Sequence, residues 1–309
     1  MDYKDTFAPV TRLETLRLMF ALAVKMNWEI RQVDVKNTYL YRDLDEEIYM
    51  EAPQGMNLPP GKVLCLLKAL YGLKQAGRAW YHRLKKVMQD FGLKQIVHEP
   101  HVFVAQKVIK GKTFTLIIPI YVDDLFPIGD KLLTDKFEHW IPKYFDVTIL
   151  GDVSLFLGIR VKRDRTTSPP YLSLNQTVYI RAMLKKHEVD TKKISKYPIS
   201  TTGATIVERP QDEPQATREE IRKYQSFIGS LMYLMLGTQP DIAYAVGQFA
   251  RFTHDPLKEH FKAVGRLFAY VNEMKNFCLT YKQQEDPTLS ICPFGSSDAD
   301  YTGELAKGH

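Results

Sequence analysis

The 309-residue sequence contains few cysteines and lacks the short motifs that mark several enzyme classes. Its three cysteines, Cys65, Cys278 and Cys292, are far apart, so they form neither a Cys-x-x-Cys metal site nor a disulfide framework. No apolar run reaches the ~18 residues that span a bilayer, and the first residues do not resemble a secretory signal. A glycine-rich phosphate loop and a nucleophile elbow are also missing. We therefore expect reduced thiols in an intracellular setting, no membrane partner, and no small-molecule enzyme of those classes.

The overall composition is that of a globular protein. Hydrophobic residues make up 45% of the chain and charged residues 25%. A chain of this length exceeds a typical single core and should divide into two or more subdomains. The net charge of +6 is mild, but it has the sign that suits a phosphate-backbone partner.

Three aspartates occur in predicted strands. Residues 114–129 form two apolar runs around Asp123 and Asp124, which predicts a buried β-hairpin. Asp34 lies between two valines on another predicted strand. A solvated hairpin tip would also explain adjacent aspartates. A carboxylate within a strand is costly unless it is paired or binds a metal, and three converging carboxylates form an oxygen site suited to Mg²⁺.

The stretch Tyr121-Val122-Asp123-Asp124 resembles the polymerase box of reverse transcriptases. Most of the chain, from residue 2 to about residue 304, is similar to the polymerase of Ty1/copia-type LTR retrotransposons. The other matching stretches follow in family order: residues 6–10, 33–36, 46–50, 70–75, 156–159, 229–234, 239–246 and 297–300. A lone Tyr-Val-Asp-Asp is weak support, whereas this ordered series is specific.

The resemblance implies an α/β (α+β) fold: a right-hand polymerase palm with an antiparallel sheet and packed helices, then a helical thumb or connection. It also implies that the chain is truncated at both ends. The expected segments are a fingers remnant and palm (1–165), the end of the palm and start of the thumb (166–200), a linker (201–217), a helical thumb or connection (218–276), and a truncated start of an RNase H-like domain (277–309). Thr217 and Glu220 have the spacing of a capping box at the start of the helical segment.

By this resemblance the chain is an RNA-directed DNA polymerase that transfers nucleotides from dNTP to a primer 3′-hydroxyl on an RNA or DNA template. Two Mg²⁺ ions, or Mn²⁺, would be held by Asp34 and Asp123, with Asp124 and the Val35 backbone carbonyl assisting. Asp298 resembles the first carboxylate of an RNase H site, but we expect no RNase H activity from residues 277–309. The alternative is a weak or inactive nucleic-acid-binding remnant of a decayed element. Relatives of this kind act in cytoplasmic virus-like particles or the nucleus.

Several residues are candidates for holding the nucleotide. Tyr39 follows Asp34 by five residues, the family offset of an aromatic ring that packs under the sugar and excludes a 2′-hydroxyl. A tyrosine that only covers the core is the alternative. The same resemblance assigns nucleotide contacts to Lys36, Gln75 and Tyr121.

Basic residues are candidates for nucleic-acid contacts. Lys74 and Arg78 lie among aromatic residues in an amphipathic segment, 66–91, a mixture that suits a single-stranded template. A solvated helix face is the alternative. Gly158 resembles a primer-grip turn, with Arg160 and Lys162 supplying charge, although it could equally be an ordinary turn glycine.

Two local features carry structural predictions. Residues 13–26 have apolar residues at helical spacing, with Thr11 and Glu14 predicted to form a capping box. Pro119 and Pro127 flank the aspartate turn, and a turn at Asp123-Asp124 would place Pro127 at a hydrogen-bonded position of the hairpin. A turn one residue earlier would place Pro119 there instead. Either register loses one ladder hydrogen bond.

Overall fold

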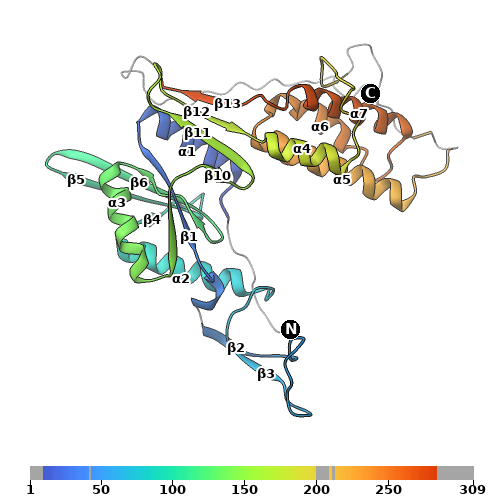
Figure 1. Ribbon diagram of the computed structural model, residues 1–309. Helices are drawn as coiled ribbons and strands as arrows, with labels where there is room; N and C mark the ends of the chain where they lie inside the picture. Colours follow the sequence, from blue (N-terminus) through green and yellow to red (C-terminus); the bar gives the residue numbers. More distant parts are fainter. Residues whose placement is uncertain (1–9, 42, 200–208, 211–212, 284–309) are drawn as a thin grey trace, which may run out of the picture.

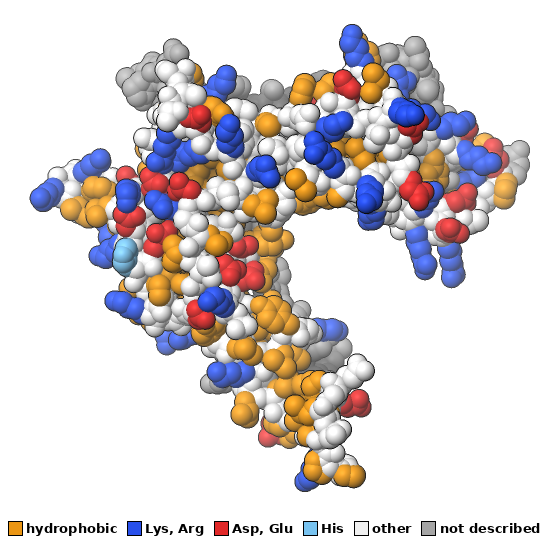
Figure 2. Space-filling view, in the orientation of Figure 1, with side chains coloured by type: hydrophobic (Ala, Val, Ile, Leu, Met, Phe, Trp, Pro, Cys, Tyr) orange, Lys and Arg blue, Asp and Glu red, His pale blue; other side chains and the backbone are white. Residues whose placement is uncertain are grey.

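The computed structural model describes residues 10–41, 43–199, 209–210 and 213–283 (Figure 1). These residues form antiparallel sheets and seven α-helices, which confirms the expected mixed α and β class. A two-stranded hairpin of β2 (Asp43–Met50) and β3 (Leu64–Lys68) and a helical unit within residues 177–273 project from the central sheets, and Figure 2 shows an open hollow between them. No helix among the described residues is long and apolar enough to cross a membrane.

The largest sheet, which we call the main sheet, has seven antiparallel strands. β7 and β8 are two parts of one strand path that lies between β6 and β1. β5 pairs with β6 on its other edge, and β9 pairs with β1. The strands are β1 (Glu29–Val35), β4 (Lys94–Gln95), β5 (Val102–Ile109), β6 (Lys112–Tyr121), β7 (Asp124–Leu125), β8 (Ile128–Gly129) and β9 (Val147–Asp152).

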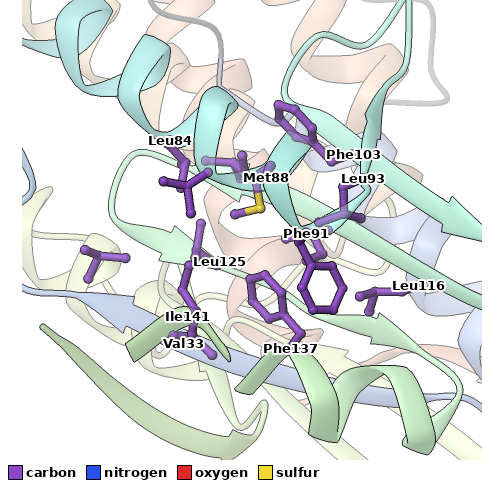
Figure 3. Close-up of a cluster of buried hydrophobic side chains, with 14 of the residues drawn as sticks. Val33, Leu84, Met88, Phe91, Leu93, Phe103, Leu116, Leu125, Phe137 and Ile141 are labelled. Atoms are coloured by element: carbon purple, nitrogen blue, oxygen red, sulfur yellow. The ribbon is translucent and has the colours of Figure 1, made fainter. Parts of the chain in front are cut away.

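Two helices cover one face of the main sheet. α2 (Ala76–Phe91) and α3 (Lys131–Trp140) pack on strands β1, β5, β6 and β7 through a continuous buried cluster (Figure 3). Alternate residues of β1 and β6 point into this cluster, because successive side chains of a strand face opposite sides. Val33 and Leu125 are fully buried there. The neighbouring residues Asp34 and Asp124 therefore face the other side of the sheet.

The other face is partly covered by α1 (Leu13–Lys25) and by a second sheet of four strands. The apolar residues that the helical spacing of 13–26 predicts on one side of this helix are buried: Leu16, Met19, Phe20, Ala23 and Val24. The Phe20 ring contacts Phe156 of the second sheet edge-on at 5.3 Å. The strands of this sheet are β10 (Leu155–Phe156), β11 (Ile159–Asp164), β12 (Tyr171–Asn175) and β13 (Leu279–Lys282).

A third core belongs to the helical unit, formed by α4 (Thr177–Lys186), α5 (Arg218–Gly237), α6 (Ala243–Ala250) and α7 (Lys258–Glu273). The predicted capping box at Thr217 and Glu220 is confirmed. The Thr217 N–H donates to the Glu220 carboxylate, and the Glu220 N–H donates to the Thr217 hydroxyl. Short 3₁₀ turns occur at η1 (Thr38–Tyr41), η2 (Ile141–Lys143) and η3 (Pro240–Ile242). The β2 (Asp43–Met50) and β3 (Leu64–Lys68) strands form the projecting hairpin.

The predicted Thr11 cap is wrong. The N-cap residue of α1 is Arg12, and no side chain caps the helix. The Thr11 backbone N–H and hydroxyl both donate to the Ile120 carbonyl, at 3.0 and 2.7 Å. Thr11 thus extends the ladder beside β6, because the Ile120 carbonyl would otherwise lie buried without a partner.

The expected segment boundaries remain predictions. Residues 279–282, placed by the sequence in the RNase H-like segment, form β13 and pair with β12. Of the expected linker, 201–217, the structure describes residues 209–210 and 213–217. Arg209 of this linker is bonded to the Asp255 carboxylate and the Pro256 carbonyl, both at 2.8 Å.

Candidate active site

The site is built around the turn that joins β6 to β7. Tyr121 pairs with Asp124, so the turn residues are Val122 and Asp123. This confirms the second of the two registers considered from the sequence. Val122 has a φ of 56°, which is uncommon for a residue that is not glycine and costly for a β-branched one. The turn therefore needs support from its surroundings.

The two prolines weaken the hairpin in different ways. The Phe126 N–H donates to the Pro119 carbonyl at 3.1 Å, but Pro119 has no N–H to return the bond. One ladder bond is thus missing, as the sequence predicts. Pro127 accepts a hydrogen bond from the Arg31 N–H at 2.9 Å and cannot donate toward β1. The missing N–H of Pro127 lies where the strand path is interrupted between β7 and β8.

The strand register brings the predicted carboxylates to one place. Asp34 of β1 lies directly opposite Asp124 of β7. Directly opposed residues of an antiparallel pair share a face, so both carboxylates lie on the side of the sheet away from α2 and α3. The Asp123 carbonyl accepts a hydrogen bond from the Val35 N–H at 3.0 Å, which places the turn beside the end of β1.

The carboxylates influence one another electrostatically. Burial is the main cause that raises the pKa of Asp34, and the charge of Asp123 raises it further against the opposing effect of Lys36. Burial likewise raises the pKa of Asp124, with the Asp123 and Asp34 charges adding to the rise. A hydrogen bond from Gln32 Nε2 to Asp124 Oδ1, at 2.9 Å, acts in the opposite direction. A bound cation would relieve this repulsion.

The described residues contain no group of three or more His, Cys, Asp or Glu side chains that is gathered closely enough to hold a metal ion. The three aspartates are thus neighbours without converging on one point. The chemistry of the donors nevertheless fits Mg²⁺ or Mn²⁺, which prefer carboxylate and carbonyl oxygen. Val35, whose carbonyl is the fourth predicted ligand, is buried next to Asp34.

Tyr39, the first predicted nucleotide contact, lies beside this turn. The Tyr39 ring meets the Tyr71 ring edge-on at 4.5 Å. Burial raises the pKa of Tyr39, followed by the effects of Tyr71 and Asp123. Tyr39 also lines a small cavity of about 40 Å³ together with Val122 and Trp80.

The other three candidates differ in their surroundings. Tyr121 ends β6, and Gln75 is the N-cap residue of α2, where its side chain makes no capping bond. The exposed Lys36 Nζ lies 3.2 Å from an Asp146 carboxylate oxygen. Exposed pairs of this kind contribute about 0–1 kcal/mol, so this contact leaves Lys36 able to exchange partners.

The predicted nucleic-acid contacts fall on two elements. Lys74 and Arg78 flank the start of α2; Lys74 is exposed and Arg78 half-buried. Arg160 and Lys162 are exposed on β11 and alternate with buried residues, so they share one face of that strand.

Gly158 lies in the tight turn between β10 and β11. Leu157 and Gly158 both have positive φ, 44° and 72°, so the turn conformation itself favours glycine. The Tyr233 hydroxyl of α5 donates to the Leu157 carbonyl and lies 3.3 Å from the position that a Gly158 Cβ would occupy. One side of the turn is therefore covered by the helical unit. Asp298, the predicted RNase H carboxylate, lies outside the described residues.

Sequence reasoning missed three side chains that support the site: Gln32, Trp80 and Tyr233. Gln32 had a usable signal, because it precedes Asp34 by two residues and a strand places such residues on one face. The contacts of Trp80 and Tyr233 join residues 42 and 76 positions apart, and no periodic pattern reveals such pairs.

Comparison with known proteins identifies the family of the chain. The sequence pattern of the family "Reverse transcriptase (RNA-dependent DNA polymerase)" matches residues 1–201. The chain belongs to this family of polymerases.

Its relatives are retrotransposon polyproteins of the Ty1/copia type. The chain is 35% identical to the retrovirus-related Pol polyprotein from transposon TNT 1-94 of Nicotiana tabacum, over 99% of the chain and 22% of that protein. It is 33% identical to the Pol polyprotein from transposon RE1 of Arabidopsis thaliana, over 98% of the chain and 20% of that protein. A yeast relative, the transposon Ty1-H Gag-Pol polyprotein of Saccharomyces cerevisiae, is 24% identical over 97% of the chain and 17% of its own length. The chain spans about a fifth of these relatives.

Proposed function

We propose that this chain catalyses template-directed DNA synthesis, adding a dNTP to the 3′-hydroxyl of a primer on an RNA or DNA template. One observation carries the proposal: Asp34 lies opposite Asp124 on one face of the main sheet, with Asp123 in the adjoining turn. Membership of the reverse transcriptase family supplies the reaction class. In this proposal the main sheet with α1 to α3 is the palm, and the helical unit is the thumb or connection.

The residues suited to hold Mg²⁺ are Asp34 and Asp123, with Asp124 and the Val35 carbonyl assisting. Bound Mg²⁺ would activate the primer hydroxyl and neutralise the charge of the departing pyrophosphate. Burial is the main cause of the raised pKa values of Asp34 and Asp124, and the Asp123 charge adds to both. This like-charge contribution supports the role, because like charges held together favour a cation between them. The Gln32 bond to Asp124 keeps that side chain oriented without adding charge.

The dNTP would lie over Tyr39, whose ring is fixed against Tyr71. In this role Tyr39 blocks a 2′-hydroxyl, while Gln75 at the start of α2 and Lys36 beside the metal ligands contact the rest of the nucleotide. Tyr121 would complete the primer side of the turn. The charge of Asp123 contributes to the raised pKa of Tyr39, after burial and Tyr71, which supports a position of this ring near the carboxylates.

The primer–template would follow the basic residues. Lys74 and Arg78 at the start of α2 suit the single-stranded template, and Arg160 and Lys162 on β11 suit the backbone of the duplex. Gly158 lies in the turn that leads into β11, and the Tyr233 hydroxyl of α5 bonds the Leu157 carbonyl of that turn. The open hollow in Figure 2 lies between the helical unit and the β2–β3 hairpin, where an extended ligand has access.

A primer-extension assay with a labelled DNA primer on an RNA template tests the proposal. We expect Mg²⁺-dependent extension by the 309-residue chain, and its loss in Asp123→Asn. The affinity for primer–template should be nearly equal in both proteins, because phosphate contacts supply most of the binding energy. Equal extension by both proteins would mean that the activity does not come from this site. Binding without extension in the unaltered chain would favour a nucleic-acid-binding remnant instead.

A further inference from the structure

The indole of Trp80 supports the aspartate turn from the helix-covered side of the main sheet. Trp80 belongs to α2 and is 2% exposed. Its Nε1–H donates to the Val122 carbonyl at 2.7 Å. Val122 is the turn residue with a φ of 56°, so this hydrogen bond fastens the strained part of the turn.

The same turn is held from the strand side by Val35, whose N–H donates to the Asp123 carbonyl. The Val122 carbonyl and the Asp123 N–H belong to one planar peptide group, and the Asp123 carbonyl belongs to the next. Two hydrogen bonds therefore restrain the peptide planes on both sides of the Asp123 α-carbon. Together they set the direction in which the Asp123 side chain leaves the backbone.

The position of Trp80 is itself fixed by packing. Its ring lies 5.0 Å from the Phe145 ring and 6.3 Å from the Tyr41 ring. The Tyr41 hydroxyl accepts a hydrogen bond from the Asp146 N–H at 2.6 Å, which holds that side of the cluster. A donor locked by its neighbours can orient a backbone group without a further loss of freedom at the time of reaction.

We propose that Trp80 is a positioning residue that holds the Val122–Asp123 peptide so that the Asp123 carboxylate is presented to the reacting groups. The inference rests on the proposed function for its effect on rate. It also joins two parts of the site, because the helix that carries Trp80 begins beside Gln75 and Arg78.

The informative variant is Trp80→Phe, which keeps an aromatic ring and removes the N–H. Trp140→Phe is the matched control, since Trp140 packs in the same buried cluster against Phe91 and Tyr144. In single-nucleotide extension we expect Trp80→Phe to lower kcat roughly 10- to 100-fold, the loss typical of a slightly misplaced reacting group. The KM for dNTP and the affinity for primer–template should stay within about twofold. The control should keep all three values.

Hydrogen exchange of the free protein provides a readout that needs no activity. In Trp80→Phe the backbone amides of residues 121–125 should exchange about tenfold faster, because a local opening is no longer restrained. In Trp140→Phe they should exchange as in the unaltered chain. If the unaltered chain extends no primer, the proposed function fails, yet faster exchange confined to Trp80→Phe would still support the inference. Unchanged exchange in Trp80→Phe, or equal losses of kcat in both variants, would overturn it.

Discussion

At the scale of single residues, the site concentrates negative charge that the fold alone does not balance. Asp34 and Asp124 face each other across two strands, and Asp123 is close enough to raise the pKa of both. The fold therefore favours their protonated forms. A raised pKa stabilises the folded protein below the ordinary carboxyl value, and this contribution is lost as the pH rises through the raised value.

This reasoning predicts that Asp124→Asn stabilises the metal-free protein at neutral pH. The amide keeps an oxygen for the Gln32 hydrogen bond and removes the charge. Like charges on opposed strands cost about 0.2–1 kcal/mol, so Tm at pH 7 should rise by roughly 0.5–4 °C. The gain should shrink as the pH is lowered toward about 4, where the unaltered carboxyl is protonated as well. Thermal unfolding followed by circular dichroism measures both values.

Magnesium provides the control for that experiment. Mg²⁺ should raise the Tm of the unaltered chain more than that of Asp124→Asn, because a ligand that binds only the folded state stabilises it by mass action. A lower Tm for the variant at pH 7 without Mg²⁺ would show that Asp124 is balanced by groups other than the aspartates.

Tyr39 carries the second prediction at this scale. Removing its ring in Tyr39→Ala should raise ribonucleotide relative to deoxyribonucleotide incorporation by roughly 10- to 200-fold, the range expected when a close steric contact is lost. Tyr41→Phe, on the same 3₁₀ turn, removes only the hydroxyl that bonds the Asp146 N–H and should leave the ratio unchanged. Single-nucleotide incorporation with each substrate gives the ratio. An unchanged ratio in Tyr39→Ala would make Tyr39 a core residue.

At the scale of elements, the sequence predicted those parts whose signals are local. The α1 helix with its buried side and the capping box of α5 follow from neighbouring residues, whereas the residues around the aspartates left two registers of the turn open. The Thr11 cap failed because a strand 109 residues away offered its hydroxyl a carbonyl partner. The supporting bonds of Gln32 and Trp80 likewise depend on how distant elements pack, and spacing along the chain does not encode that.

The contact between α5 and the β10–β11 hairpin is open to a direct test. Tyr233→Phe removes the hydroxyl that bonds the Leu157 carbonyl. We expect a loss of about 0.5–1.5 kcal/mol in the free energy of unfolding, with faster amide exchange at residues 155–160. Denaturant titration and exchange mass spectrometry give the two quantities.

Tyr179→Phe is the matched control for this contact. The Tyr179 ring meets the Tyr233 ring edge-on, with 4.8 Å between the ring centroids, and the Tyr179 hydroxyl donates to the Ser230 carbonyl at 2.9 Å, within the helical unit. It should lose similar stability while leaving exchange at the hairpin unchanged. Equal exchange at the hairpin in both variants would mean that α5 does not hold the turn.

At the scale of the whole molecule, the shape and charge suit a long anionic ligand. The helical unit and the β2–β3 hairpin extend from the main sheet and leave a hollow between them (Figures 1 and 2). The net charge is +6, while the carboxylates of the site form a local negative region. Contacts with the phosphate backbone of such a ligand must therefore come from basic residues beside the site and not from the carboxylates of the site.

Salt dependence identifies these contacts. Arg160 and Lys162 share an exposed face of β11, so a duplex lying on this strand would meet both. Each phosphate contact contributes about 0.9 to the slope of log affinity against log salt, because neutralising a phosphate releases condensed counterions. We expect the magnitude of this slope for a primer–template to decrease by about 1 in Arg160→Ala and by about 2 in the double variant with Lys162→Ala. Fluorescence anisotropy between 50 and about 200 mM salt spans the range in which such slopes are measured.

Lys136→Ala is the control for net charge. Lys136 is exposed on α3, which covers the opposite face of the main sheet, so its removal lowers the positive charge equally without touching the expected duplex. Its slope should match that of the unaltered chain. If all three substitutions reduced the slope alike, the binding would depend on overall charge alone. An unchanged slope in the double variant would mean that the duplex binds another surface and that β11 does not contact it.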